Sequence, residues 1–134
     1  MAVPADKKQF ASAAVAIRLF DSIEAGDIAA ARACFVPHAV VWYSIDQTER
    51  PRDAVAATLQ AMVNRMSDIT YSNRRLQPLR HGFVQQHVLE ATRRDGKRIG
   101  IPVAVIAQVE KGLIVRIDEY MDSALVAEFR KIFD

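Results

Sequence analysis

Two glutamates and one histidine in the second half of the chain are the side chains best suited to acid–base chemistry. Glu90 and Glu119 stand in segments of alternating apolar residues, and His87 precedes Glu90 by three positions. A carboxylate on an apolar face is costly unless it is protonated or paired, so its pKa rises toward the range that suits proton transfer. These residue types predict an acid–base site in which Glu119 moves a proton and Glu90 or His87 assists.

The turns between the strands decide which of these side chains share a face. Asp95-Gly96 is typical of a two-residue hairpin loop, and residues 110–112 are typical of a three-residue loop that ends in glycine. With these loops, Glu90 lies opposite Ile101, and Val103 lies opposite Glu119. The register predicts one apolar face made up of Val88, Glu90, Ile101, Val103, Val105, Ile117 and Glu119.

Each candidate catalytic residue has a second interpretation. The glutamates could stand near the rim of the sheet, solvated or paired with an arginine, and Glu90 is close to the basic hairpin. His87 falls on the opposite face in this register, and a bulge in its strand would be needed to bring it into a pocket. The opposite face is mildly apolar and predicts a homodimer contact through the sheet; it also holds Leu89, Pro102, Ala104 and Ile106.

Other side chains are predicted to surround a small apolar substrate. On the first strand, Trp42 and Ser44 share one face and Tyr43 takes the other, and either aromatic ring could line the cavity. Met62 belongs to the buried stripe of a helix, where methionine is more often core filler than a binding feature. The predicted substrate-binding residues are Trp42, Tyr43, Ser44, Met62, Val88, Ile101, Val103 and Ile117.

Three helices and a set of strands must position these residues. Apolar residues at helical spacing predict a first helix over 8–25 with the stripe Phe10, Ala13, Ile17 and Phe20. Gly26 ends it, a second helix runs from Asp27 to Pro37, and a third runs over 51–66. Strands are predicted at 39–43, 69–79, 83–93, 98–109 and 113–121, and a last helix after Asp122 with Leu125, Phe129 and Ile132 on one side. The pattern predicts one α+β domain over 1–134, with the N-terminal helices covering a curved antiparallel sheet.

Composition narrows the function classes. A formal net charge of +2 argues against a nucleic-acid partner, and the basic cluster at 93–98 is explained by a solvated turn. The single cysteine, Cys34, excludes a disulfide within the chain and fits a small buried apolar side chain. No segment has the apolar length of a membrane span, and Arg18 interrupts the apolar run that follows Lys7 and Lys8. We therefore expect a cytoplasmic protein without a membrane partner.

The element order and the last strand carry a family resemblance. The stretch over 112–116, Gly-Leu-Ile-Val-Arg, leads to Glu119-Tyr120-Met121-Asp122. Together with the order helix, helix, strand, helix and meandering strands, it resembles the nuclear-transport-factor-2-like superfamily, in particular its SnoaL-like branch. The resemblance covers nearly the whole chain. It implies a cone-shaped sheet wrapped around the helices, described as a cystatin-like α+β barrel, with a helix-capped pocket and frequent dimers through the sheet.

The resemblance also implies a range of activities. Members of the superfamily include polyketide cyclases, ketosteroid isomerases, dehydratases and limonene epoxide hydrolases, which use pocket acids and bases without cofactors. Glu119 and Glu90 match two aspartates of the epoxide hydrolases, but Val88 replaces their arginine, and Trp42-Tyr43-Ser44 replaces their Tyr-x-Asn element. The resemblance therefore implies an isomerase, cyclase or lyase more than an epoxide hydrolase. A non-catalytic ligand-binding or dimerisation module of the same fold is the alternative.

Overall fold

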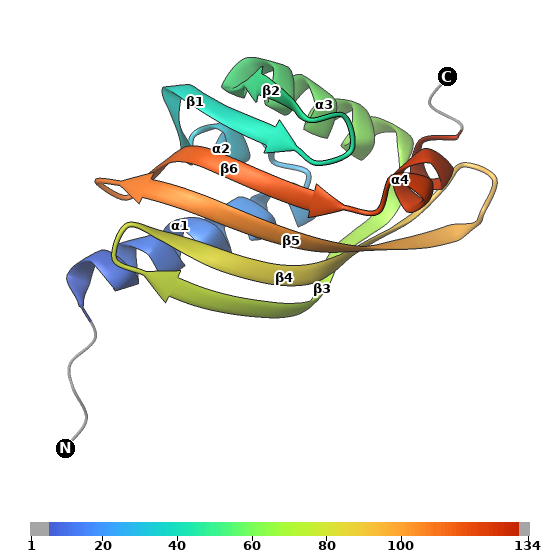
Figure 1. Ribbon diagram of the computed structural model, residues 1–134. Helices are drawn as coiled ribbons and strands as arrows, with labels where there is room; N and C mark the ends of the chain where they lie inside the picture. Colours follow the sequence, from blue (N-terminus) through green and yellow to red (C-terminus); the bar gives the residue numbers. More distant parts are fainter. Residues whose placement is uncertain (1–5, 132–134) are drawn as a thin grey trace.

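The computed structural model describes residues 6–131 (Figure 1). The helices are α1 (Lys7–Glu24), α2 (Ile28–Arg32), α3 (Arg52–Arg65) and α4 (Ser123–Arg130), and the strands are β1 (Phe35–Tyr43), β2 (Thr48–Pro51), β3 (Ser67–Leu79), β4 (Gly82–Thr92), β5 (Arg98–Glu110) and β6 (Leu113–Met121). The predicted order of helices and strands is confirmed. The predicted second helix is wrong beyond Arg32, because β1 already begins at Phe35, and β2 replaces a predicted loop. Ile132, predicted on one side of the last helix, lies outside the described residues.

The strands form one curved sheet in the order β2-β1-β6-β5-β4-β3. Helix α1 packs against β3 and β4, α3 packs against β1 and β2, and α4 contacts β5. Figure 1 shows the long helices on one side of the sheet, so that the sheet has an inner, helix-covered face and an open outer face. The predicted α+β class is confirmed, with one correction: β1 and β6 run parallel, whereas all other neighbours are antiparallel. Strand composition does not reveal this direction, because β1 and β6 are far apart in the chain.

Helix α1 shows how an alanine-rich helix can mislead a sequence pattern. It begins at a capping box, in which the Asp6 carboxylate accepts a hydrogen bond from a first-turn N–H and the Gln9 side chain accepts one from the Asp6 N–H. Its buried residues are Ser12, Val15, Ala16, Leu19, Phe20 and Ile23. The predicted stripe is wrong for Phe10 and Ile17, which are 63% and 49% exposed. Apolar side chains occur on several sides of this helix, and packing against the sheet selects one of them.

The β4–β5 hairpin has a different loop from the predicted one. The Arg93 N–H donates to the Lys97 carbonyl over 2.9 Å, which leaves a three-residue loop in which Gly96 has a φ of 88°. Because side chains alternate between faces, this shift of one residue moves every β4 side chain to the face opposite the predicted one. The inner face carries His87 and Leu89 opposite Val103 and Ile101, and the outer face carries Val88 and Glu90.

The β5–β6 hairpin also differs, with a smaller consequence. Its loop has two residues, Lys111 and Gly112, with φ values of 51° and 76° that fit a type I′ turn, and a register shift follows at Gln108 and Val109. Glu119 therefore pairs with Val105 and not with Val103. A shift of two residues leaves each side chain on its face, so Glu119 stays on the inner face as predicted.

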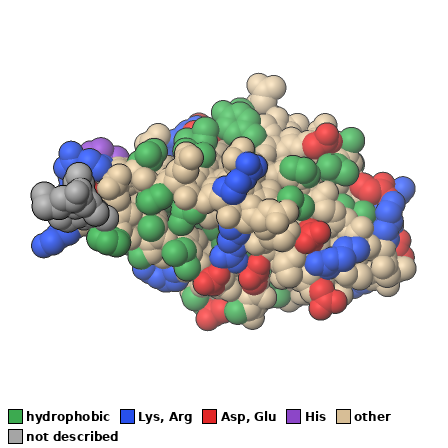
Figure 2. Space-filling model, turned by 90° about the horizontal axis from the view of Figure 1, so that it is seen from below, with side chains coloured by type: hydrophobic (Ala, Val, Ile, Leu, Met, Phe, Trp, Pro, Cys, Tyr) green, Lys and Arg blue, Asp and Glu red, His purple; other side chains and the backbone are tan. Residues whose placement is uncertain are grey.

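The remaining surface and core agree with the composition. Cys34 is buried, and burial raises the pKa of its thiol, as expected of a small core side chain. Acidic and basic side chains are interspersed over the face shown in Figure 2. Within residues 6–131, no helix is both long and apolar enough to cross a membrane.

Candidate active site

Glu119 stands on the inner face of the sheet between two strands. Its neighbour on β1, across the parallel pair, is Tyr43, and its neighbour on β5 is Val105. The Glu119 carbonyl accepts a hydrogen bond of 2.9 Å from the Ser44 N–H, which holds this end of β6 against β1. Burial raises the pKa of the Glu119 carboxyl from its ordinary value of 4.5 to about 7, and the positive charge of Arg130 opposes part of that rise. Glu119 can therefore both accept and donate a proton near neutral pH.

Two tyrosine phenols share the surroundings of Glu119. Tyr43 and Tyr71 are both buried, and burial raises the pKa of each phenol well above its ordinary value. The next largest cause of both rises is the negative charge of Glu119, which places the two phenols within electrostatic reach of the carboxylate. Both phenols stay protonated over the physiological range and are able to donate hydrogen bonds.

A cavity of about 210 Å³ opens beside these three side chains. A smaller cavity of about 50 Å³ adjoins the same residues deeper in the core, and Tyr43, Leu59, Tyr71 and Glu119 line both cavities. The larger cavity is otherwise lined by Thr58, Ala61, Met62, Leu89, Ile101, Met121, Val126, Phe129 and Arg130. A carboxyl group and phenols on the wall of an apolar cavity fit a small, largely apolar ligand that presents a polar group to them.

His87 lies on the inner face, where it packs against Tyr71 and does not line the cavity beside Glu119. Its ring makes edge contacts with Phe20 and Tyr71, with centroid distances of 4.9 Å and 4.8 Å. The Gln85 side-chain amide donates to Nδ1 over 2.9 Å, so the ring proton stands on Nε2, which has no hydrogen-bond partner. Burial lowers the His87 pKa to about 4, with a smaller contribution from the charge of Arg74. The predicted outer-face position of His87 is thus wrong, yet the ring is neutral and does not line the Glu119 cavity.

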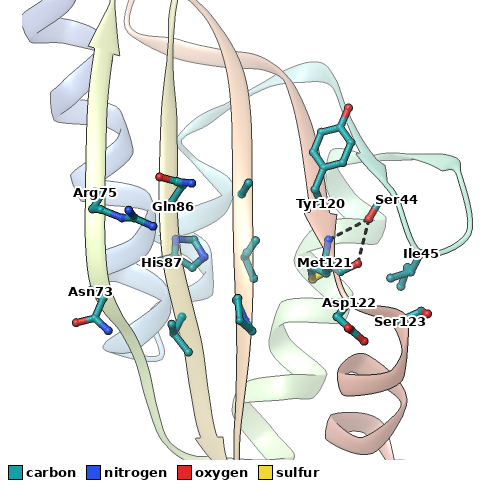
Figure 3. A pocket seen from close by; sticks show the side chains of 14 residues that line it. Ser44, Ile45, Asn73, Arg75, Gln86, His87, Tyr120, Met121, Asp122 and Ser123 are labelled. Atoms are coloured by element: carbon teal, nitrogen blue, oxygen red, sulfur yellow. Dashed lines mark hydrogen bonds between the residues drawn. The ribbon is translucent and has the colours of Figure 1, made fainter.

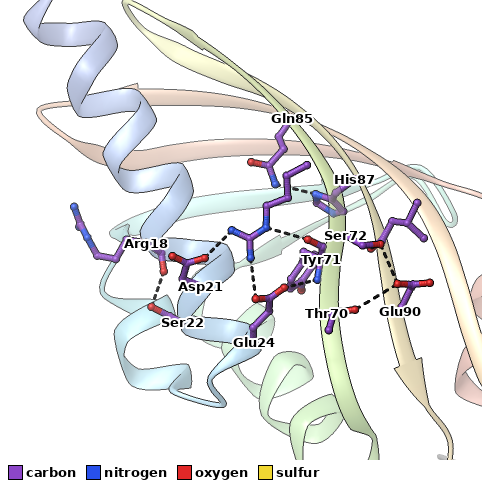
Figure 4. A network of polar contacts seen from close by, with 12 residues as sticks. Arg18, Asp21, Ser22, Glu24, Thr70, Tyr71, Ser72, Gln85, His87 and Glu90 are labelled. Carbon is purple, nitrogen blue, oxygen red and sulfur yellow. Dashed lines mark hydrogen bonds and ion pairs between the residues drawn. The ribbon is translucent and has the colours of Figure 1, made fainter.

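A polar network fixes Tyr71 to helix α1 (Figure 4). The Tyr71 N–H donates to the Glu24 carboxylate, and the Tyr71 carbonyl accepts from Arg74 Nε over 3.0 Å. Arg74 also forms ion pairs of 2.7 Å with Asp21 and 3.0 Å with Glu24. A register shift in β3 lies next to this network, at Asn73, whose φ of 53° lies in the left-handed region. The network sets the backbone position from which the Tyr71 ring reaches the cavity.

Glu90 is the main correction to the predicted site. It lies on the outer face, where its carboxylate accepts hydrogen bonds from Ser72 over 2.9 Å and from Thr70 over 3.5 Å. The one-residue difference in the β4–β5 loop explains this reversal, and it also moves Val88 to the outer face. Glu90 and Glu119 are therefore on opposite sides of the sheet and do not form a pair of carboxylates.

Two predicted substrate-binding residues of β1 and its following loop also face outward. The Trp42 ring packs against Tyr120 at a tilt of 59° with a centroid distance of 5.3 Å, and the Ser44 hydroxyl accepts from the Met121 N–H over 3.0 Å. Figure 3 shows Ser44 and Tyr120 at an open groove on the outer face, which Val88 also lines. Met121 lines both this groove and the cavity beside Glu119, whereas Ser44, Val88 and Tyr120 line only the groove.

The other predicted substrate-binding residues lie on or near the inner cavity. Tyr43, Met62 and Ile101 line the larger cavity, and Ile117 lines the smaller one. Val103 is buried on the inner face opposite His87. Their role in substrate binding remains a prediction.

Sequence reasoning missed three polar residues of the cavity, Thr58, Tyr71 and Arg130. Tyr71 stands in a weakly patterned polar segment, and the one available signal was a lone aromatic residue between polar neighbours. Arg130 directly follows Phe129, which was predicted to face the core. The position of the last helix could therefore have indicated that Arg130 lies near the interior. Within residues 6–131, no three His, Cys, Asp or Glu side chains are grouped as ligands for a metal ion.

Comparison with known proteins identifies the class of the chain. The family model of the SnoaL-like domain matches residues 16–117, and the chain belongs to this family. The match covers α2, α3 and most of the sheet, and it ends before Glu119 and α4. It confirms the family that the sequence resembled. No curated protein sequence matches the chain.

Solved structures share the fold at low sequence identity. A proposed polyketide cyclase from Xanthomonas campestris pv. campestris has a TM-score of 0.80 and 14% identity, covering 92% of this chain and 99% of its own. A proposed isomerase from Bacillus subtilis has a TM-score of 0.80 and 9% identity, covering 94% and 96%. IdmH from Streptomyces antibioticus, a proposed polyketide cyclase, has a TM-score of 0.76 and 15% identity, covering 90% and 99%. These likenesses establish a nuclear-transport-factor-2-like fold for the chain.

Proposed function

We propose that the chain is a cofactor-independent enzyme that moves a proton on a small, largely apolar carbonyl compound. The observation that carries the proposal is the Glu119 carboxyl, which has a pKa of about 7 and stands on the wall of an apolar cavity beside two protonated phenols. A base whose pKa lies near the working pH combines a useful ionised fraction with useful basicity. The names of the structural relatives, two proposed cyclases and a proposed isomerase, are compatible with this chemistry.

The proposed reaction uses the three polar groups in turn. Glu119, as a carboxylate, removes a proton from the carbon next to the carbonyl, and the electron pair of the broken C–H bond moves toward the carbonyl oxygen. Tyr43 and Tyr71 donate hydrogen bonds to that oxygen as negative charge develops on it. The protonated Glu119 then returns the proton to another carbon or to a departing oxygen. The first outcome is an isomerisation, and the second is an elimination.

Other reactions of the superfamily fit these residues less well. Epoxide hydrolysis in the relatives that the sequence resembles needs an arginine at the position of Val88 and a second carboxylate at Glu90, and both positions lie on the outer face. His87 does not replace the missing group, because its pKa of about 4 leaves it neutral and its ring lies behind Tyr71. Single-base proton transfer at Glu119 needs neither group.

Proton exchange on a ring ketone tests the proposal directly. Wild-type protein in D₂O should accelerate exchange of the protons next to the carbonyl of cyclohexanone, followed by NMR, and the rate should rise with pH through about 7 as Glu119 ionises. Glu119→Gln should lower the rate about 10²- to 10⁴-fold, as expected for loss of a general base. Tyr43→Phe and Tyr71→Phe should each lower it by up to about 10³-fold through loss of an oxyanion donor.

The matched control is Glu90→Gln, which removes a carboxylate from the outer face of the same sheet. It should leave the exchange rate close to that of the wild type. Cyclohexanone that binds but exchanges at the same rate with wild type and Glu119→Gln would instead identify the chain as a non-catalytic ligand-binding module.

A further inference from the structure

Arg130 is a partly buried cation at the cavity without an anionic partner. It stands at the end of α4 and lines the 210 Å³ cavity. Other arginines that are shielded from solvent hold carboxylates: Arg74 pairs with Asp21, Arg93 with Glu128, and Arg116 with Asp118. Among residues 6–131, no carboxylate forms an ion pair with Arg130. The guanidinium is therefore available to a ligand in the cavity.

The positive charge of Arg130 acts on the same site as Glu119 without being neutralised by it. It lowers the pKa of both Glu119 and Tyr43, so it lies within electrostatic reach of both. Glu119 and Arg130 are the two charged side chains among the residues that line the larger cavity. The cavity is thus lined by a proton-transfer group and a cation that come from different elements, Glu119 from β6 and Arg130 from α4.

The form of a guanidinium favours one kind of anion. Its N–H groups match the two oxygens of a carboxylate in a planar, bidentate arrangement, and such charge-assisted bonds are about twice as strong as neutral ones. A partly buried guanidinium that already lacks a protein partner gains more from such a bond than an exposed one, because less water competes for it.

The size of the cavity limits the rest of the ligand. A cavity of about 150 Å³ lined by apolar side chains holds one benzene molecule. The 210 Å³ here, with the adjoining 50 Å³, therefore has room for one ring and its substituents, or for two small fused rings. The Leu59, Met62, Leu89, Ile101 and Phe129 side chains form apolar walls suited to the body of such a ring. A ligand of four fused rings would exceed this volume.

We propose that the cavity selects one-ring or small two-ring ketones that carry a carboxylate, with Arg130 binding the carboxylate while the ring carbonyl lies at Glu119, Tyr43 and Tyr71. The proposal names the substrate class of the proton-transfer site and rests on the function proposed above. It makes Arg130 a specificity-determining residue. A neutral ketone of the same shape fills the same cavity but leaves the guanidinium without a partner.

Two ligands of matched shape test this selection. 4-Oxocyclohexanecarboxylate and 4-oxocyclohexanecarboxamide differ in charge at one end and share the ring ketone at the other. In calorimetric titrations at pH 7, the wild type should bind the carboxylate at least about tenfold more tightly than the amide. Arg130→Gln should abolish this preference without changing the affinity for the amide, and Arg130→Lys should keep part of it because it keeps the charge but not the fork of donors.

The control variant is Arg94→Gln, which removes an exposed arginine from the β4–β5 loop and should retain the full preference. Equal affinity of the wild type for the two ligands, a preference that survives Arg130→Gln, or no binding of either ligand at millimolar concentration would overturn the inference. If Arg130→Gln does not fold, Arg130→Lys decides: a carboxylate preference smaller than that of the wild type supports the inference, and an undiminished preference overturns it.

Failure of the proposed chemistry gives a different result from failure of the selection. A carboxylate preference that depends on Arg130, without proton exchange on 4-oxocyclohexanecarboxylate, would refute the enzymatic function and keep the binding inference. If proton exchange depends on Glu119 but proceeds at equal rates on the carboxylate and on the amide, the proposed enzymatic function would stand and the selection for a carboxylate would be refuted.

Discussion

Replacing Glu119 with glutamine should make the stability of the protein less sensitive to pH. Burial raises the pKa of the Glu119 carboxyl from 4.5 to about 7, so between these values the folded protein binds a proton that the unfolded chain releases. A carboxyl with a raised pKa in the folded state contributes its full stability below the unfolded value. That contribution is lost as the pH rises through the folded value. The neutral form therefore stabilises the fold, and ionisation weakens it.

The size of this effect follows from the two pKa values of Glu119. A change of one pKa unit corresponds to about 1.4 kcal/mol, so the rise from 4.5 to about 7 corresponds to roughly 3 kcal/mol. Glutamine keeps the shape of the side chain and does not titrate. The free energy of unfolding of Glu119→Gln, relative to wild type, should therefore increase by roughly 3 kcal/mol between about pH 4 and pH 8.

Urea unfolding followed by circular dichroism at a series of pH values measures this difference. The titrations of all other groups are common to both proteins and cancel in the comparison. Glu90→Gln serves as the reference for loss of a carboxylate that is bonded to Ser72 on the outer face. A difference between wild type and Glu119→Gln that stays constant with pH, or that changes in the opposite direction, would refute the assignment of Glu119 as a buried carboxyl with a raised pKa.

Two further substitutions test the supports of the site. His87→Ala removes a buried ring that contacts Phe20 and Tyr71 and should lower the free energy of unfolding by about 2–4 kcal/mol, measured in urea, whereas an unchanged stability would contradict the packing role. Arg93→Gln breaks the contacts of the β4–β5 loop with the Glu128 carbonyl and carboxylate, and should speed hydrogen exchange at the α4 amides while those of β4 stay protected. Equal protection of α4 in both proteins would show that α4 is held by other contacts.

Much of the fold could be predicted from local features of the sequence. Asp27 and Asp122 cap the helices that follow them, and their carboxylates accept backbone N–H bonds at these positions. The third helix was predicted to include Pro51 in its first turn, and Pro51 instead stands directly before α3 as an extended N-cap residue at the end of β2. The capping interactions of the two aspartates join residues only a few positions apart. Their contribution therefore depends on the local sequence and not on the packing of distant segments.

The site could be predicted less completely, because it depends on pairing between strands. Asp95 and Gly96 are compatible with a loop of two or three residues, and the observed loop includes Arg94. That single residue decides whether Glu90 or His87 faces the helices. At the β5–β6 hairpin, the predicted register was wrong by two residues. A shift of two residues leaves each side chain on the same face, so the predicted inward position of Glu119 was correct.

The sequence by itself determined most of the helices and strands, the α+β class and a carboxylate on an apolar strand. The tertiary structure decided which residues surround that carboxylate: Tyr43 across a parallel pair, Tyr71 held to α1 by Arg74, and Arg130 carried over the cavity by α4. Caps and turns act over a few residues and leave a local pattern in the chain. Strand pairing and helix docking join distant segments, and their outcome depends on the packing of the whole core.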